Sequence, residues 1–165
     1  MKYLHLEIFL AFMLFALAPS ALHAQNILEE QAKTPEVAIS AREFLQRGKL
    51  NLEKMAYGAA IRNFNQAILL NPNMADSYYY RGLIRATLED QLGAISDFDD
   101  AILRDPRHSW AYYHRAGVFF NLDNQAEGIL DLQLAAQLFS EQGERTGYQQ
   151  AVKLLNHFGV KSPVD

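Results

Sequence analysis

The sequence contains no cysteine among its 165 residues. Disulfide bonds, thiolate nucleophiles, cysteine-ligated zinc and lipid attachment through an N-terminal cysteine are therefore excluded. It also lacks any cluster of basic residues, and 15 Lys and Arg against 19 Asp and Glu give a formal net charge of −4. A nucleic-acid partner is not expected, because phosphate neutralisation requires Lys and Arg gathered on one face.

Patterns for catalysis or metal binding are missing as well. No glycine-rich phosphate loop, Ser-His-Asp set or pair of catalytic carboxylates can be assembled. His108 and His114 are six residues apart, which does not place two ligands on one face of a helix. We expect His108 to be a surface or capping residue beside a turn. The acidic residues Asp97, Asp99 and Asp100 lack a calcium-loop glycine and fall inside a predicted helix. The sequence thus predicts no enzyme, no cofactor and no metal site.

The first 24 residues have the layout of a secretory signal peptide. Lys2 gives a positive start, residues 8–18 are an unbroken apolar run, and Pro19 breaks it. This run is shorter than the roughly 20 residues that cross a bilayer, and no stable membrane span is expected after it is removed. We predict export with cleavage between Ala24 and Gln25. An uncleaved interfacial anchor is the alternative.

A period of 34 residues runs through most of the remaining sequence. Arg47, Arg81 and Arg115 are spaced at this interval. Further sets at the same interval are Ala67, Ala101 and Ala135; Ile61, Ile95 and Ile129; and Phe64, Phe98 and Leu132. Such a period is the mark of a repeat protein. We predict three units, at residues 41–74, 75–108 and 109–142.

Each unit predicts two helices, because its apolar residues follow helical spacing twice with a break between them. In the second unit the small residues Gly82, Ala94 and Ala101 fall where the two helices would touch. Small side chains suit a close approach of two backbones. One isolated pair cannot bury its apolar stripe, so successive pairs should stack and share a core.

The residue pattern of the units resembles that of a known family. The stretches YGAAIRNFNQA (residues 57–67) and GAISDFDDA (residues 93–101) carry it, together with Pro72 and Pro106. Over roughly residues 41–140 the chain resembles the tetratricopeptide repeat (TPR). The resemblance implies an all-α, right-handed superhelical stack of three helix–turn–helix units that binds another polypeptide. The third unit departs from the pattern, with Ala116 for Gly, Gly128 for Ala and Ser140 for Pro.

The segments on either side of the units carry helix signals of their own. Residues 25–33 read as a polar lead, and Thr34 followed by Pro35 predicts that the first helix begins near Pro35, within residues 25–40. Residues 144–158 are amphipathic and Gly159 is a stop signal. We predict a helix within residues 143–159 that covers the exposed end of the stack, followed by a tail at 160–165.

Arginine at the seventh place of each unit also departs from the family pattern, where Leu is common. Asp97 and Asp131 follow Arg81 and Arg115 by sixteen residues. We hypothesise that each arginine pairs with that aspartate and links the two helices of its unit. The alternative is a solvated guanidinium whose stem packs over the apolar stripe.

The resemblance places a groove along the first helices of the units. Helix positions facing this groove are unusually apolar and aromatic. The predicted groove residues are Arg42, Leu45, Lys49, Tyr79, Tyr80, Leu83, Trp110, Tyr113, His114 and Phe120. Tyr and Trp bury much area with few rotatable bonds, so they favour partner contacts. We predict a groove that binds an extended or apolar polypeptide.

Two alternatives to the groove stay open. Its residues could pack on one another, on the final helix or on residues 25–33, and the chain could instead be a self-associating structural scaffold. A carboxylate clamp of the chaperone-binding TPR proteins is not expected, because its places hold Leu45, Lys49, Tyr80, Trp110 and His114.

The repeat wording is also similar to that of exported repeat proteins of cyanobacteria. The terminal run Tyr148-Gln149-Gln150-Ala151 is part of this likeness. It implies the periplasm or the thylakoid lumen, and a role in assembly or scaffolding.

Overall fold

The computed structural model describes residues 40–164, and within this range every regular element is a helix. The helices are α2 (Ala41–Glu53), α3 (Tyr57–Leu70), α4 (Ala75–Thr87), α5 (Gln91–Arg104), α6 (Ser109–Asn121), α7 (Gln125–Gln142) and α8 (Arg145–His157). The predicted all-α class is confirmed. The predicted signal peptide and the polar lead lie outside the described residues.

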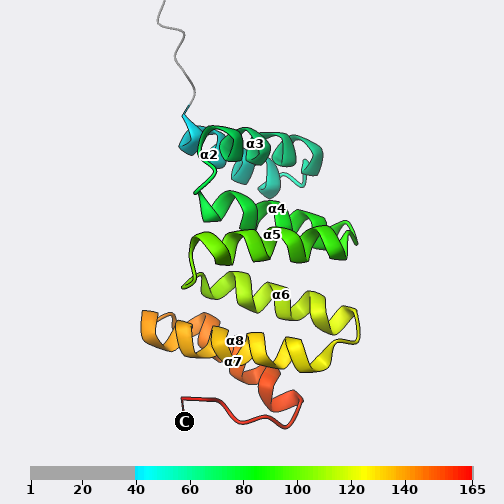
Figure 1. Cartoon of the computed structure of the whole chain (residues 1–165), viewed down its shortest axis with the longest axis vertical. Coiled ribbons are helices and arrows are strands. Elements are labelled where there is room, and N and C mark those ends of the chain that lie inside the picture. The colour runs from blue at the N-terminus through cyan, green and yellow to red at the C-terminus, as the bar shows by residue number, and fades with distance from the viewer. Residues whose placement is uncertain (1–39, 165) are drawn as a thin grey trace, which may run out of the picture. The chain divides into compact units, whose positions relative to one another are not determined.

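The helices form a stack of antiparallel pairs. Helix α2 packs on α3, α4 on α5 and α6 on α7, while α3 with α4, α5 with α6, and α7 with α8 join successive elements. Contacts of α2 with α4 and of α4 with α6 set the first helices of the pairs in one row. Figure 1 shows the pairs following one another, with α2 and α3 at one end of the stack and α7 and α8 at the other. The predicted helical repeat stack is confirmed.

The hydrophobic core runs through the stack without a break. It consists of three clusters of buried side chains, one for each pair of helices. Tyr80 packs against both the first and second clusters, and Ile102 and Trp110 pack against both the second and third. Each pair therefore buries its apolar stripe against its neighbour, as the repeat pattern requires.

Ser40 sets the start of the first helix. Its hydroxyl accepts a hydrogen bond from the Glu43 amide at 3.2 Å, and the Glu43 carboxylate accepts one from the Ser40 amide at 2.8 Å. This reciprocal capping box satisfies two free amides at the end of α2. The helix of the first unit therefore begins at Ala41, and the prediction of a start near Pro35 is wrong. Ser40 itself has extended backbone angles, which end the helix on its N-terminal side.

A small residue on the first helix receives a ring from the second helix of each pair. A Cβ added to Gly48 would lie 2.4 Å from the Phe64 ring, and one added to Gly82 would lie 2.9 Å from Phe98. The third pair has Ala116 and Leu132 at the equivalent positions, both fully buried in one cluster. In the third pair an alanine takes the place of the glycine, and a leucine takes the place of the phenylalanine ring. The added methyl group on the first helix is thus matched by a smaller side chain on the second helix. This match accounts for one departure of the third unit from the family pattern.

The predicted arginine–aspartate pairs are confirmed. Arg81 Nη2 lies 2.7 Å from Asp97 Oδ1, and Arg115 Nε lies 2.8 Å from Asp131 Oδ2. Both aspartates are buried. Because each arginine is on the first helix of its pair and each aspartate on the second, the ion pairs link α4 to α5 and α6 to α7.

These arginines also connect one pair of helices to the preceding one. Arg81 Nη1 donates to Asn65 Oδ1 of α3 at 2.6 Å, and Arg115 forms an ion pair with Asp99 of α5. The first pair of helices differs, because Asn63 replaces the aspartate and its amide donates to the Ala59 carbonyl at 2.8 Å.

The turn between the two helices of each pair repeats one backbone conformation. Met55, Glu89 and Asp123, which are 34 residues apart, have φ values of 57°, 63° and 59°. This left-handed conformation is unusual for residues other than glycine. At the C-terminal end, Gly143 and Gly159 have φ values of 71° and 70° and follow α7 and α8. The predicted stop at Gly159 is confirmed.

Candidate interaction surface

A row of aromatic side chains crosses the first helices of the stack. We call Tyr79, Tyr80, Trp110, Tyr113 and His114 the aromatic row. Tyr79 lies 4.9 Å from Tyr80 and 5.9 Å from His114 between ring centroids, and Trp110 lies 5.8 Å from His114 and 5.6 Å from Tyr113. The structure thus brings these predicted groove residues of α4 and α6 together.

The row continues onto α2 through Lys49. The Lys49 ammonium lies 5.0 Å from the centroid of the Tyr80 ring, a cation–π arrangement. Arg42 of α2 is exposed, and Leu83 of α4 is half-buried against the core. Lys49 and Arg42 therefore give the α2 end of the predicted groove its positive charge.

Two predicted groove residues belong to the interior instead. Leu45 is 7% exposed and Tyr79 is 8% exposed. The Tyr79 ring also packs against Phe98 of α5 and against His108. Burial raises the pKa of the Tyr79 hydroxyl, with smaller contributions from Tyr80 and Asp76. The prediction that Leu45 and Tyr79 are exposed is wrong, because the neighbouring pairs of helices close over both positions.

The side chain of Phe120 also packs against other residues of the chain. Its ring stacks on Phe158 at 4.5 Å, and a Cβ added to Gly128 would lie 2.6 Å from it. The ring therefore fills the space between α6, α7 and the end of α8, and Gly128 replaces the family's alanine because the ring leaves no room for a methyl group. The alternative that groove residues pack on the final helix holds for Phe120.

His108 caps a helix beside the aromatic row, and His114 packs within the row. His108 Nδ1 accepts a hydrogen bond from the Ala111 amide at 3.2 Å, so its expected capping role at the start of α6 is confirmed. The other ring nitrogen lies 3.4 Å from Asp76 Oδ1, and this hydrogen bond lowers the pKa of Asp76. Burial lowers the pKa of His114 to about 4, with a smaller contribution from His108.

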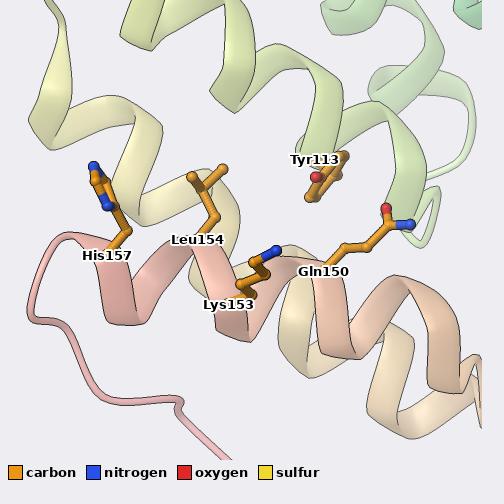
Figure 2. A pocket seen from close by; sticks show the side chains of 5 residues that line it. All are labelled: Tyr113, Gln150, Lys153, Leu154 and His157. Atoms are coloured by element: carbon orange, nitrogen blue, oxygen red, sulfur yellow. The ribbon is translucent and has the colours of Figure 1, made fainter.

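A hollow of about 440 Å³ lies between α6 and α8. Its lining residues are Tyr113, Gln150, Lys153, Leu154 and His157. Figure 2 shows the last four along α8, with Tyr113 facing them from α6. We call this space the α6–α8 hollow. Tyr113 belongs to both the hollow and the aromatic row, so the two features are continuous.

The four α8 residues of the hollow were missed by the sequence analysis, which gave α8 only a covering role. Their spacing of three, four and seven residues sets them on one face of the helix. Only Leu154 among them is apolar, so the face reads as a solvated one in sequence. The predicted covering role was based on the more apolar stripe through Ala151 and Leu155, and this stripe does pack into the core.

The acidic residues of α5 are engaged in ion pairs. Asp97 binds Arg81, Asp99 binds Arg115, and Asp100 Oδ1 lies 2.7 Å from Arg104 Nη1. Within residues 40–164 no group of three or more His, Asp or Glu side chains is placed to hold a metal ion. None of the described helices combines the length and apolar character that a membrane span needs.

Solved structures give the likeness that decides the fold. The TPR2B domain of yeast Sti1, in a complex with pHsp70, aligns with a TM-score of 0.59 at 24% identity over 69% of this chain and 97% of that one. The secretion translocator chaperone SycD of Yersinia enterocolitica aligns with a TM-score of 0.66 at 19% identity, covering 72% and 92%. The chain has a TPR-like fold.

A third solved structure agrees with this. The second TPR domain of Spaghetti (RPAP3), bound to an HSP90 peptide, aligns with a TM-score of 0.59 at 22% identity, covering 60% of this chain and 92% of that one. At these identities the likeness establishes the TPR-like fold alone. No protein-family model matches the sequence, and no curated protein matches it either.

Proposed function

We propose that the chain is a protein-interaction module that binds an extended polypeptide along the row formed by α2, α4, α6 and α8. The observation that carries this proposal is the α6–α8 hollow, which continues the aromatic row and has Tyr113 and Leu154 in its lining. Concave, largely apolar spaces with a few polar groups at the edge are typical binding sites. TPR-like domains of similar fold that hold peptides support the same class of function.

The proposed surface is a revised form of the predicted groove. Lys49, Tyr80, Trp110 and Tyr113 remain its central contacts, because their side chains are half-buried and retain a solvent-facing part. Arg42, Leu83 and His114 flank it. The proposed surface no longer includes Leu45, Tyr79 and Phe120, whose side chains pack within the protein. The α8 residues of the hollow take their place as contacts for the polypeptide.

A change at Leu154 tests this surface. Peptides selected from a displayed library on the purified chain should bind Leu154→Asp at least about tenfold more weakly, because a carboxylate replaces an apolar wall of the hollow. Leu92→Asp is the matched control, since Leu92 is 76% exposed on α5. Tyr113→Ala gives a second, less disruptive test, and circular dichroism checks folding. Equal affinities for wild type and all three folded variants would exclude the surface.

We further propose that the protein is exported and takes part in assembly or scaffolding in the periplasm or the thylakoid lumen. The pattern of residues 1–24 and the similarity in repeat wording support this. N-terminal sequencing of protein isolated from its own compartment tests the first step. A start at Gln25 is expected, and a retained Met1 would contradict cleavage.

Self-association is a second candidate function, favoured by leucines on the second helices. Leu69, Leu92, Leu103 and Leu130 are between 65% and 76% exposed on α3, α5 and α7. Leu69 and Leu103 occupy equivalent places in their units. Sedimentation of the purified chain distinguishes the two functions: a dimer broken by Leu103→Asp would support a scaffold, and a monomer that binds peptides would exclude it.

A further inference from the structure

The two helices that border the α6–α8 hollow carry no carboxylate, although the chain as a whole is acidic. Neither Ser109–Asn121 nor Arg145–His157 contains Asp or Glu. The formal net charge of the chain is nevertheless −4, and α5 alone has three aspartates. The distribution leaves this part of the molecule with basic groups in an otherwise acidic protein.

The basic groups at the hollow are available for a partner. Lys153 and His157 are exposed and line the hollow on successive turns of α8. No carboxylate within residues 40–164 forms an ion pair with Lys153. By contrast, Arg81, Arg104 and Arg115 are each bound to an aspartate of the chain. The Lys153 ammonium is therefore placed to meet a negative charge that another molecule brings.

Apolar and basic groups both line the hollow. Leu154 and the Tyr113 ring form an apolar wall, and Lys153 precedes Leu154 in the chain. In an extended peptide, side chains two residues apart point to the same face and are separated by about 7 Å. A large apolar residue entering the hollow would thus leave a carboxylate two positions away near Lys153.

We propose that the α6–α8 hollow binds an extended segment of another protein in which a large apolar residue is two positions from an Asp or Glu. This inference rests on the proposed function and names the partner chemistry of the same surface. The carboxylate is an internal side chain rather than a chain end. A terminal carboxylate needs several donors that converge on it, whereas the donors here are the exposed side chains of Lys153, Gln150 and His157. A lysine also carries its charge on a flexible stem.

Titration of the ¹⁵N-labelled full chain with capped nonapeptides tests the proposal. One peptide has Phe-Ser-Glu at its centre, a second has Phe-Ser-Gln, a third has Phe-Ser-Lys, and all are acetylated and amidated. At low ionic strength the Glu peptide should bind about three- to fivefold tighter than the Gln peptide and shift the amide signals of α8, because one exposed ion pair is gained. Lys153→Glu should reverse the order of the Glu and Lys peptides, and Lys54→Glu, an exposed site on α2's end, should not.

The outcomes separate this inference from the proposed function. Equal binding of the Glu and Gln peptides, or a preference for Glu that survives Lys153→Glu, would overturn the acidic partner while leaving a peptide surface in place. If no peptide of any charge shifts signals from α6 or α8, both proposals fail.

Discussion

Asp97 is a carboxylate enclosed by the protein, with 1% of its side chain exposed. Arg81 Nη2 lies 2.7 Å from one of its oxygens and Arg85 Nη1 lies 3.0 Å from the other. A buried charge is tolerated when it is paired and its hydrogen bonds are satisfied, and removal of one partner leaves an uncompensated charge. Asp97 therefore holds two arginines of α4 against α5.

Replacement of Asp97 tests this role at the residue scale. Asp97→Asn should lower the free energy of unfolding by about 3 kcal/mol, because it leaves two partly buried guanidinium groups without their carboxylate. Asp99→Asn is the matched control. Asp99 is 55% exposed, so loss of its pair with Arg115 should cost less than about 1 kcal/mol. Urea unfolding measures both, and similar costs would contradict the argument.

Met55 bears a backbone cost that glycine would remove. It has a φ of 57° and is 74% exposed. The residue therefore adopts the left-handed conformation of the turn, and its side chain adds little to the packing of the core. Met55→Gly should raise the free energy of unfolding by about 0.5–1 kcal/mol, because the left-handed strain is relieved and part of the gain is lost to unfolded-chain entropy. Thermal unfolding measures the change. Gly58→Ala, in the helix that follows, controls for helix propensity, and a lower melting temperature for Met55→Gly would contradict the prediction.

At the scale of elements, the fit between a small residue and a ring sets the distance between paired helices. Gly48 lies under the Phe64 ring so closely that a Cβ would overlap it. Gly48→Ala should therefore cost about 1–3 kcal/mol through overpacking. The third pair of helices accommodates alanine because it carries Leu132 in place of the ring.

A double-mutant cycle tests whether a smaller side chain at Phe64 relieves the overpacking of Gly48→Ala, as Leu132 does beside Ala116 in the third pair. Phe64→Leu should cost about 1 kcal/mol or more by removing buried volume. Combined with Gly48→Ala, it should cost less than the sum of the two single changes, because the smaller side chain makes room for the methyl group. Denaturant unfolding of all four proteins measures the coupling. Additive costs would mean that the two positions do not set the helix spacing together.

At the scale of the whole molecule, His114 links the pairs of helices and makes their packing sensitive to pH. Its ring lies between Tyr79 of α4, Phe98 of α5 and Trp110 of α6. Its pKa is lowered from 6.5 to about 4 by burial. The folded protein therefore resists protonation of this group while the unfolded chain accepts it.

Stability should fall as the solution becomes acidic. Above pH 6.5 His114 is neutral in both states and contributes fully. Between pH 6.5 and about 4 only the unfolded chain gains the proton, so the free energy of unfolding should drop by up to about 3 kcal/mol. Urea unfolding at several pH values measures this. His114→Phe keeps a ring and removes the proton site, so it should flatten this part of the profile; an unchanged profile would exclude His114 as the cause.

The sequence by itself determined the period and the pairs of helices, and it suggested the arginine–aspartate links as a hypothesis that the structure confirms. These depend on spacing within one unit, and a sixteen-residue interval such as Arg81 to Asp97 is fixed once both helices form. The sequence also predicted that small residues such as Gly82 lie where the two helices touch, since small side chains allow a close approach of two backbones. The start of α2 was misjudged because Ser40 competed with Thr34 as a cap, and local propensity does not choose between two adequate caps.

Only the tertiary structure decided which groove positions stay open. Tyr79 and Phe120 have the helix positions of exposed groove residues, yet neighbouring helices cover them, because burial depends on the volume that facing side chains leave. The same stacking brings Leu154 and Lys153 of α8 opposite Tyr113 and creates the α6–α8 hollow. A repeat pattern specifies how each helix meets its partner, whereas the space between α6 and α8 arises from elements that are not adjacent in the chain.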